Sequence, residues 1–184
     1  GMDYFEIERA TWGNVSVGAE VGKNFGSIIG PDFKRNANGD ILINPETGLP
    51  QYDETTRTLG NASWDWTGGF YHTLTYKNFR LSAAFDVKVG ADIFSMAMRS
   101  AFQTGKAPET LEGREAWYTS EEKRMAEGMT IEQWRAAGKC DGFYAPGVID
   151  NGDGTYRKND IAIDPQTYWE SVSRNAPSMF IYDN

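Results

Sequence analysis

The chain has 184 residues, of which 40% are hydrophobic and 14% aromatic, a composition too apolar for a disordered polypeptide. Its 26 acidic and 18 basic residues give a net charge of -8, which argues against nucleic acid as a partner because such binding rests on Lys and Arg. The single cysteine, Cys140, excludes an internal disulfide, and the chain has no run of about 18 apolar residues that would predict a membrane-spanning helix.

The first part of the chain carries the patterns of strands and turns. Residues 14–22 alternate apolar and polar side chains, as a strand with one apolar face does. The stretch 23–65 is rich in Gly, Asn, Asp and Pro, so we expect a long loop there. Within it we expect a small hairpin that turns at Asn38-Gly39, because both residue types tolerate positive φ.

The clearest pattern lies in residues 67–90. In "FRLSAAFDVKVG" (79–90), Phe, Leu, Ala, Phe, Val and Val alternate with Arg, Ser, Ala, Asp and Lys. The run 67–76 also alternates, and Lys77-Asn78 joins the two runs, so the stretch predicts an antiparallel hairpin. Each arm has about ten residues, which is longer than the usual soluble strand and long enough to cross a bilayer when tilted.

After residue 90 the hydrophobic period becomes helical. Residues 91–105 have apolar side chains at helical spacing and end at a glycine. We expect further short helices over 107–118, 119–128, 130–138 and 164–175.

Capping residues mark the starts of these helices. Thr119 or Ser120 is the expected cap of one helix, and Thr130 followed by Gln133 is a capping-box pattern. Asp164, followed by a proline, is a typical start for the last one.

Two unequal parts follow from these patterns: residues 1–90 form a β-strand and hairpin segment, and residues 91–184 form a helical and irregular loop region. The hairpin turns within two residues at one end, while roughly 40 and 80 residues of loop or short helix lead from its other end. Short turns on one side and long loops on the other are the layout of an outer-membrane barrel. The sequence therefore predicts a mainly β fold of antiparallel hairpins within such a barrel, and an α+β fold if the chain folds in isolation.

The order of "LGN", "DWTGG", the hairpin and "GADIFSM" within residues 59–96, followed by "ETLEGREAWY" (109–118), carries a resemblance. It resembles the C-terminal region of the SusC/RagA-type TonB-linked outer-membrane transporters of Bacteroidetes. The similarity extends from about residue 15 to the closing "FIYDN".

The resemblance implies a part of a TonB-dependent nutrient importer in the outer membrane, supplying barrel strands and extracellular loops. In this family a barrel of about 22 strands is plugged. The chain lacks the plug, the segment that engages TonB and most of the strands, so we expect a fragment that is inactive alone. The implied partners are a SusD-like surface lipoprotein and an oligosaccharide or peptide substrate, and TonB would act only through the absent parts.

The sequence predicts no catalytic residue, no cofactor and no metal site. His72 is the only histidine and has no cysteine beside it. Residues 150–160, "DNGDGTYRKND", resemble a calcium loop but lack the acidic residue at the twelfth position, where Ile161 stands. A Gly-rich hairpin turn is the preferred interpretation, and the chain is not expected to be an enzyme.

Loop aromatics are the remaining candidates for a binding site, because aromatic faces can stack on sugar rings. These candidates are Trp64, Trp66, Trp117, Tyr118 and Trp134. The alternative, which we favour, is that they pack the loops together, or that Trp64 and Trp66 belong to an aromatic girdle at the membrane surface.

A second function class stays open: a stand-alone soluble β-rich module for carbohydrate binding or structure. The apolar face of 79–90 then needs a cover other than lipid, because burying one such side chain stabilises by roughly 1.5–3 kcal/mol. The expected covers are the chain's own helices or the hairpin of a second copy in a homodimer.

Overall fold

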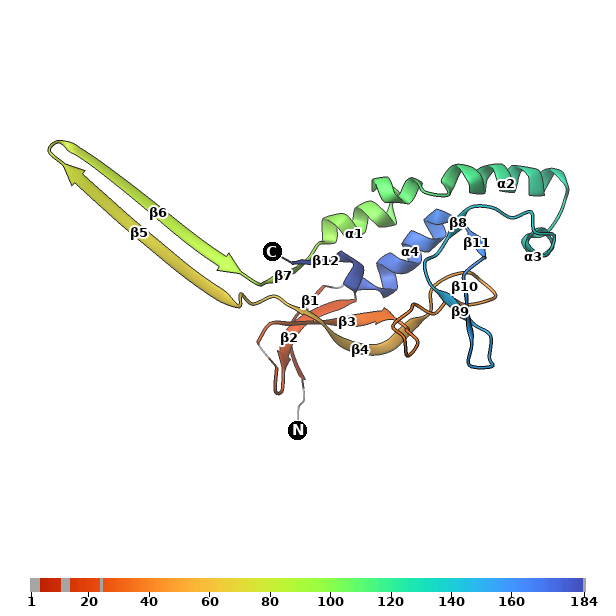
Figure 1. The fold of residues 1–184 in the computed structure, drawn as a ribbon, viewed down its shortest axis with the longest axis horizontal. Coiled ribbons are helices and arrows are strands. Elements are labelled where there is room, and N and C mark those ends of the chain that lie inside the picture. Colours follow the sequence, from red (N-terminus) through yellow and green to blue (C-terminus); the bar gives the residue numbers. More distant parts are fainter. Residues whose placement is uncertain (1–3, 11–13, 24, 184) are drawn as a thin grey trace.

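A two-stranded hairpin projects from a body that holds the other strands and the helices (Figure 1). The computed structural model describes residues 4–10, 14–23 and 25–183. The fold is α+β, and the described strands form one four-stranded and four two-stranded antiparallel sheets rather than a closed barrel. None of the helices within these ranges has the length and apolar character needed to cross a membrane.

The four-stranded sheet is built from the N-terminal part of the chain. Its strands pair in chain order: β1 (Tyr4–Ala10), β2 (Val15–Glu20), β3 (Ser27–Phe33) and β4 (Tyr52–Asn61). Strand β2 confirms the strand predicted over 14–22. The long loop predicted over 23–65 is wrong, because β3 and β4 lie inside it. Nearly every residue of β3 is buried, and a strand buried on both faces has no alternation that could reveal it.

The turn predicted between these two strands is present. Gly39 adopts a φ of +90°, and the side chain of Asn36 accepts hydrogen bonds from the backbone N–H groups of Asn38 and Asp40, both at 2.9 Å. Only single bridges flank the turn, such as Arg35 with Ile41, so the arms are shorter than those of a regular hairpin.

The predicted hairpin over 67–90 is confirmed as β5 (Trp66–Tyr76) and β6 (Phe79–Val89). The two strands pair without a register shift, from Tyr76 opposite Phe79 at the turn to Trp66 opposite Val89 at the root. Lys77 adopts a φ of 50°, since a tight two-residue turn needs a positive φ to match the twist of the strands. No other described strand pairs with this ribbon.

Two helices begin where the capping signals predict: α3 (Ile131–Ala136) and α4 (Pro165–Asn175). The helix predicted over 91–105 is shorter: α1 (Met96–Gln103) begins after its cap, Ser95, because residues 92–94 form a strand instead. The hydroxyl of Thr130 accepts from the backbone N–H of Gln133, and the Gln133 side chain accepts from the backbone N–H of Thr130 at 3.0 Å, which completes the capping box. Asp164 caps α4 by accepting from the backbone N–H of Gln166 at 3.0 Å.

The two helices predicted over 107–118 and 119–128 are instead one 3-10 turn, η1 (Pro108–Leu111), and one continuous helix, α2 (Arg114–Ala126). The predicted helix start at Thr119 or Ser120 is therefore wrong. Ser120 is buried within α2, and its hydroxyl oxygen accepts from the indole N–H of Trp134 at 2.9 Å and the backbone N–H of Asp141 at 3.1 Å. A hydroxyl with such tertiary partners is stable inside a helix and does not need to cap one.

Short antiparallel strand pairs connect segments of residues 91–183, which belong to the region predicted to be helical and irregular. The pairs are β7 (Asp92–Phe94) with β12 (Ile181–Asp183), β8 (Phe143–Tyr144) with β11 (Ala162–Ile163), and β9 (Val148–Asp150) with β10 (Tyr156–Lys158). A second 3-10 turn, η2 (Pro177–Phe180), precedes β12. The β9–β10 turn is the Gly-rich hairpin predicted within 150–160.

Helix α4 lies at the centre of the hydrophobic core. Its Trp169 ring lies 4.5 Å from that of Phe102 on α1, and its Tyr168 ring lies 4.7 Å from that of Phe143 on β8, measured between ring centroids. The other buried members include Phe33, Ile43, Ile149, Ile163, Val172 and Phe180. The hairpin contributes no residue to this core, so the prediction that the chain's own helices cover its apolar face is wrong.

Candidate functional site

The two faces of the β5–β6 hairpin differ in their chemistry. Residues directly opposite each other in an antiparallel pair point to the same face, so the pairing of Phe70 with Phe85 and of Leu74 with Leu81 places the apolar rows of both strands together. The apolar face consists of Trp66, Phe70, Leu74, Tyr76, Phe79, Leu81, Ala83, Phe85, Val87 and Val89, with Gly68 and His72 among them.

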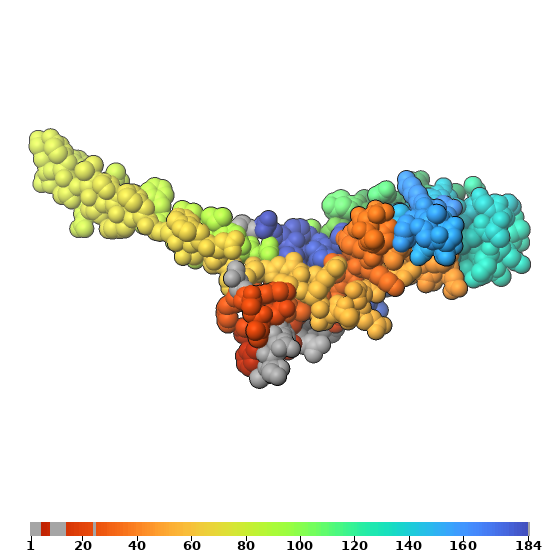
Figure 2. Space-filling view, turned by 60° about the horizontal axis from the view of Figure 1, so that its bottom comes forward, coloured from red at the N-terminus to blue at the C-terminus, as the bar shows by residue number. Residues whose placement is uncertain are grey.

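No described part of the body covers the apolar face. Phe79 is 81% exposed, Leu81 68% and Phe85 61%. Figure 2 shows the hairpin, in yellow and green, as a bare arm that meets the body at one end. A lone two-stranded hairpin is marginally stable in water, and monomeric soluble proteins rarely expose a contiguous apolar patch of more than a few hundred Å². The face therefore requires a partner or a lipid phase.

The length of the hairpin matches the apolar layer of an outer membrane. Each strand has 11 residues, which at about 3.3 Å per residue span about 36 Å. A strand of that length rises about 26 Å when tilted by about 45°, close to the apolar band of about 25 Å that surrounds membrane barrels.

Aromatic rings lie at both ends of β5. Trp66 at the root is 56% exposed, and Tyr76 beside the turn is 66% exposed. The ammonium of Lys77 lies 5.4 Å from the centroid of the Tyr76 ring, so the turn presents an aromatic ring and a cation together. Girdles of such amphipathic rings flank the apolar band of membrane strands at the two water interfaces.

The opposite face of the hairpin is polar. The hydroxyl groups of Thr73 and Ser82 are hydrogen-bonded across the two strands at 3.1 Å, and Lys88 pairs with Asp86 at 3.7 Å. Hydrogen bonds with Thr73 and Ser82 lower the pKa of the Tyr71 phenol on the same face. This face is suited to water, as the interior of a membrane barrel requires.

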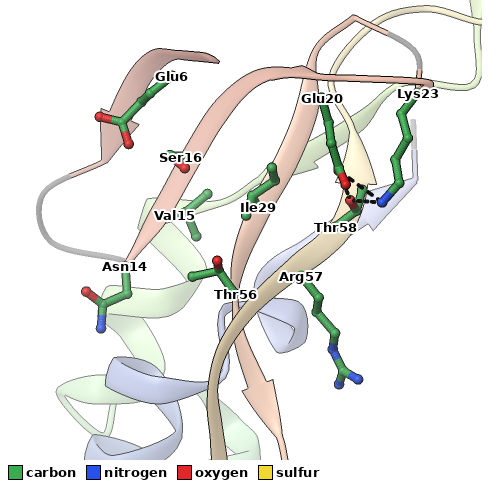
Figure 3. A pocket seen from close by; sticks show the side chains of 10 residues that line it. All are labelled: Glu6, Asn14, Val15, Ser16, Glu20, Lys23, Ile29, Thr56, Arg57 and Thr58. Atoms are coloured by element: carbon green, nitrogen blue, oxygen red, sulfur yellow. Dashed lines mark hydrogen bonds and ion pairs between the residues drawn. The ribbon is translucent and has the colours of Figure 1, made fainter. Parts of the chain in front are cut away.

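A second feature is a polar hollow of about 510 Å³ on the four-stranded sheet (Figure 3). Val15 and Ile29 form the apolar part of its lining. On one side the Glu20 carboxylate accepts from the Thr58 hydroxyl at 2.8 Å and pairs with Lys23 at 2.9 Å. Both contacts lower the pKa of Glu20, so this carboxylate is charged at neutral pH. The other lining residues are Glu6, Asn14, Ser16, Thr56 and Arg57.

The hollow has the size and chemistry of a site for a hydrophilic small molecule. Its volume falls within the range of about 300–1,000 Å³ that ligand pockets occupy. Hydroxyl, amide and carboxylate groups can exchange hydrogen bonds with a polar ligand, while Arg57 turns away to pair with Asp32. Within the described ranges no three metal-ligating side chains come together, here or elsewhere.

The aromatic candidates from the sequence do not gather at one place. Trp66 belongs to the hairpin and Trp64 to the link before it, whereas Trp117 and Tyr118 lie on α2. Tyr118 is 58% exposed, and the ring of Trp117 lies against Gly142. These positions therefore do not make a shared sugar-binding platform.

Trp134 is unavailable to a ligand. Its side chain is 2% exposed, its indole N–H donates to the hydroxyl of Ser120, and the ammonium of Lys139 lies 4.8 Å from its ring centroid. The structure gives it a packing role, which is the alternative that we favoured from the sequence.

The remaining chemical candidates are separate from one another. His72 lies mid-hairpin, with its ring 6.0 Å from that of Phe70 between centroids. The carboxylates of Asp150 and Asp153 accept backbone N–H groups within the β9–β10 turn, at 2.8 and 2.9 Å, as turn residues do. Burial raises the pKa of the Cys140 thiol, which makes it less reactive.

The polar hollow was missed by sequence reasoning. Glu6 comes from β1, Glu20 from the end of β2 and Thr58 from β4, so its polar groups are far apart along the chain. Alternation along one strand shows which residues share a face, but only the pairing of four strands brings these residues together.

Comparison with known proteins identifies no relative of the chain, because neither a protein-family model nor a curated protein matches it. The function is therefore argued from the hairpin and the hollow.

Proposed function

We propose that the chain is part of an outer-membrane, TonB-dependent nutrient importer of the SusC/RagA type, to which it supplies barrel strands and external loops. The observation that carries this proposal is the uncovered hairpin, with one apolar face, one polar face and the length of a tilted membrane strand. Lipid covers the apolar face, and neighbouring strands of the barrel pair with the backbone N–H and C=O groups along both edges.

The proposal also assigns a side of the membrane to each end of the hairpin. The two-residue turn at Lys77 faces the periplasm, and the body with its helices lies outside, because barrels of this kind have short periplasmic turns and long external loops. A SusD-like lipoprotein and an oligosaccharide or peptide substrate meet the body there, and TonB acts through other parts of the transporter.

The polar hollow on the four-stranded sheet supports contact with a hydrophilic substrate. It combines carboxylate, hydroxyl and amide groups with an apolar part formed by Val15 and Ile29. Such a mixture suits a molecule that carries many hydroxyl or amide groups over a carbon skeleton. The role of the body in this proposal is binding, and no catalysis is assigned to it.

Two adjacent alanines on opposite faces of β6 provide a matched test. Ala83 lies on the apolar face and Ala84 on the polar face. In the full chain carrying Cys140→Ala, either alanine is replaced by cysteine, labelled with a nitroxide and placed in a mild non-ionic detergent. We expect the label at 83 to collide with oxygen dissolved among the detergent chains and the label at 84 to collide with a water-soluble nickel chelate. Equal accessibility at both positions would contradict the proposal.

A stand-alone soluble module is the second candidate, and the extent of the apolar surface favours it. The nine large side chains of the apolar face are 46% to 81% exposed. At about 100 Å² each they offer about 900 Å² per copy, so two hairpins packed face to face would bury about 1,800 Å² in a homodimer. That area is close to a standard stable interface of about 1,600 Å².

Sedimentation of the full chain with and without detergent separates the two candidates. A monodisperse dimer in water, in which the nitroxide at 83 is shielded from both oxygen and the nickel chelate, would support the soluble module. Irregular association in water that detergent reverses to a monomer would support the membrane strand pair, because lipid-facing strands associate without defined order.

A further inference from the structure

The strand pair β7–β12 lies at the root of the hairpin and carries two carboxyl groups opposite each other. The register aligns Asp92 with Asp183, and β7 follows β6 after two residues. The backbone N–H of Ser95 donates to the carbonyl of Phe180 at 2.8 Å, which extends the contact to the start of α1. This ladder therefore joins the strand that leaves the hairpin to the last segment of the described chain (Figure 1).

The neighbouring elements bring the carboxyl groups close to the backbone. Asp92 accepts the backbone N–H of Asn61 at 2.7 Å, which connects β4 to β7. The Asp65 side chain lies directly against Gly90, and its backbone N–H donates to the carbonyl of Val89 at 2.9 Å. Asp65 thus places a third carboxylate at the same root.

These three aspartates have no cationic partner in the described part of the chain: none of the ion pairs among its residues includes any of them. Like charges directly opposite each other destabilise an antiparallel pair. The pKa of the Asp183 carboxyl is raised, because it is hydrogen-bonded to Asp92 and repelled by the charges of Asp92 and Asp65. A hydrogen bond between two carboxyl groups requires that one of them keep its proton.

We propose that Asp92 and Asp183 form a pH-sensitive clasp at the root of the hairpin. When the Asp183 carboxyl is ionised, its repulsion from Asp92 loosens β12 from β7. When Asp183 keeps its proton, its hydroxyl donates to Asp92, and the ladder closes and holds the root of the hairpin against the C-terminal segment. The clasp goes beyond the proposed function, since it operates whether lipid or a second copy covers the hairpin.

The sign of the pH dependence follows from the direction of the shift. An acid whose pKa is raised by folding binds its proton more tightly in the folded state, so protonation stabilises that state. The clasp is therefore fully closed below the ordinary pKa of an aspartic acid. It opens as the pH rises through the raised pKa of Asp183.

Hydrogen exchange of the full chain tests the clasp, in a mild non-ionic detergent that covers the hairpin. The protection of residues 92–94 and 181–183, corrected for intrinsic exchange, is measured from about pH 4 to about pH 8. We expect protection to be about twofold to fivefold higher at the acidic end. Asp183→Asn removes the charge and keeps a hydrogen-bond donor. In this variant residues 92–94 and 181–183 should therefore show, at every pH, the protection that the wild-type chain shows only at the acidic end.

The control is Asp86→Asn, which removes an exposed carboxylate of β6 that pairs with Lys88 instead of another acid. It should follow the wild-type pH response. The proposal is overturned if Asp183→Asn keeps that response, or if it lowers protection at every pH. An ordinary pKa for Asp183 in a carboxyl-carbon NMR titration would overturn it as well.

Discussion

Replacing Phe85 with Lys probes the apolar face near its middle. Phe85 lies close to the midpoint of β6 and faces Phe70 across the hairpin, with the ring centroids 6.3 Å apart. If this face is built for lipid, Phe85→Lys should weaken the transfer of the hairpin from water into detergent micelles.

The exposed area sets the size of the effect. A phenylalanine side chain can bury roughly 200 Å². Because Phe85 is 61% exposed, about 120 Å² of its side chain remains in contact with solvent. At about 25 cal/mol per Å², covering it contributes about 3 kcal/mol, which corresponds to a factor of about 150 in the partition constant. In a bilayer with paired strand edges, a cation at this depth costs roughly 2–4 kcal/mol in addition.

The assay follows a fluorescent probe on Ala83→Cys, in the full chain with Cys140→Ala, as the detergent concentration rises. Ser82→Lys is the matched control, because it adds the same charge to the same strand but on the polar face. We expect its partition free energy to stay within about 0.5 kcal/mol of the parent. Similar losses for Phe85→Lys and Ser82→Lys would refute the assignment of the two faces.

Three further predictions concern the body. Gly113 has a φ of +71°, and a Cβ there would lie 2.6 Å from the backbone nitrogen of Phe143. Gly113→Ala should therefore lower the free energy of unfolding, measured in urea, by more than about 1 kcal/mol. An unchanged free energy of unfolding would contradict this packing. Thr130→Ala removes the capping box with Gln133 and should lower the same quantity by about 1 kcal/mol, while Thr130→Ser should retain most of it. Burial raises the pKa of Tyr52 to about 12, so the stability it contributes is fully present below about pH 10 and is lost as the pH rises through about 12. Tyr52→Phe should lose less stability over that alkaline range, and an identical loss would exclude this phenol as the cause.

Local patterns in the sequence were sufficient for the hairpin and for the starts of α3 and α4. Alternation along 67–90 and a two-residue turn specify two paired strands, because both features act between neighbours in the chain. The capping residues at Thr130 and Asp164 act in the same way, through side-chain contacts to backbone groups two or three residues ahead. The part of the apolar face that lies on β6 could therefore be predicted residue by residue, whereas Trp66, expected in a loop, belongs to that face through its pairing with Val89.

Tertiary structure decided the features that depend on contacts between distant segments. Strand β3 has no alternation because it is buried on both faces, and Ser120 lies inside a helix because Trp134, on another helix, donates to its hydroxyl. The polar hollow exists only where four strands are paired. The exposure of the hairpin also could not be predicted from the sequence. Alternation shows that one face of a strand is apolar, but the arrangement of the other elements determines whether anything covers that face.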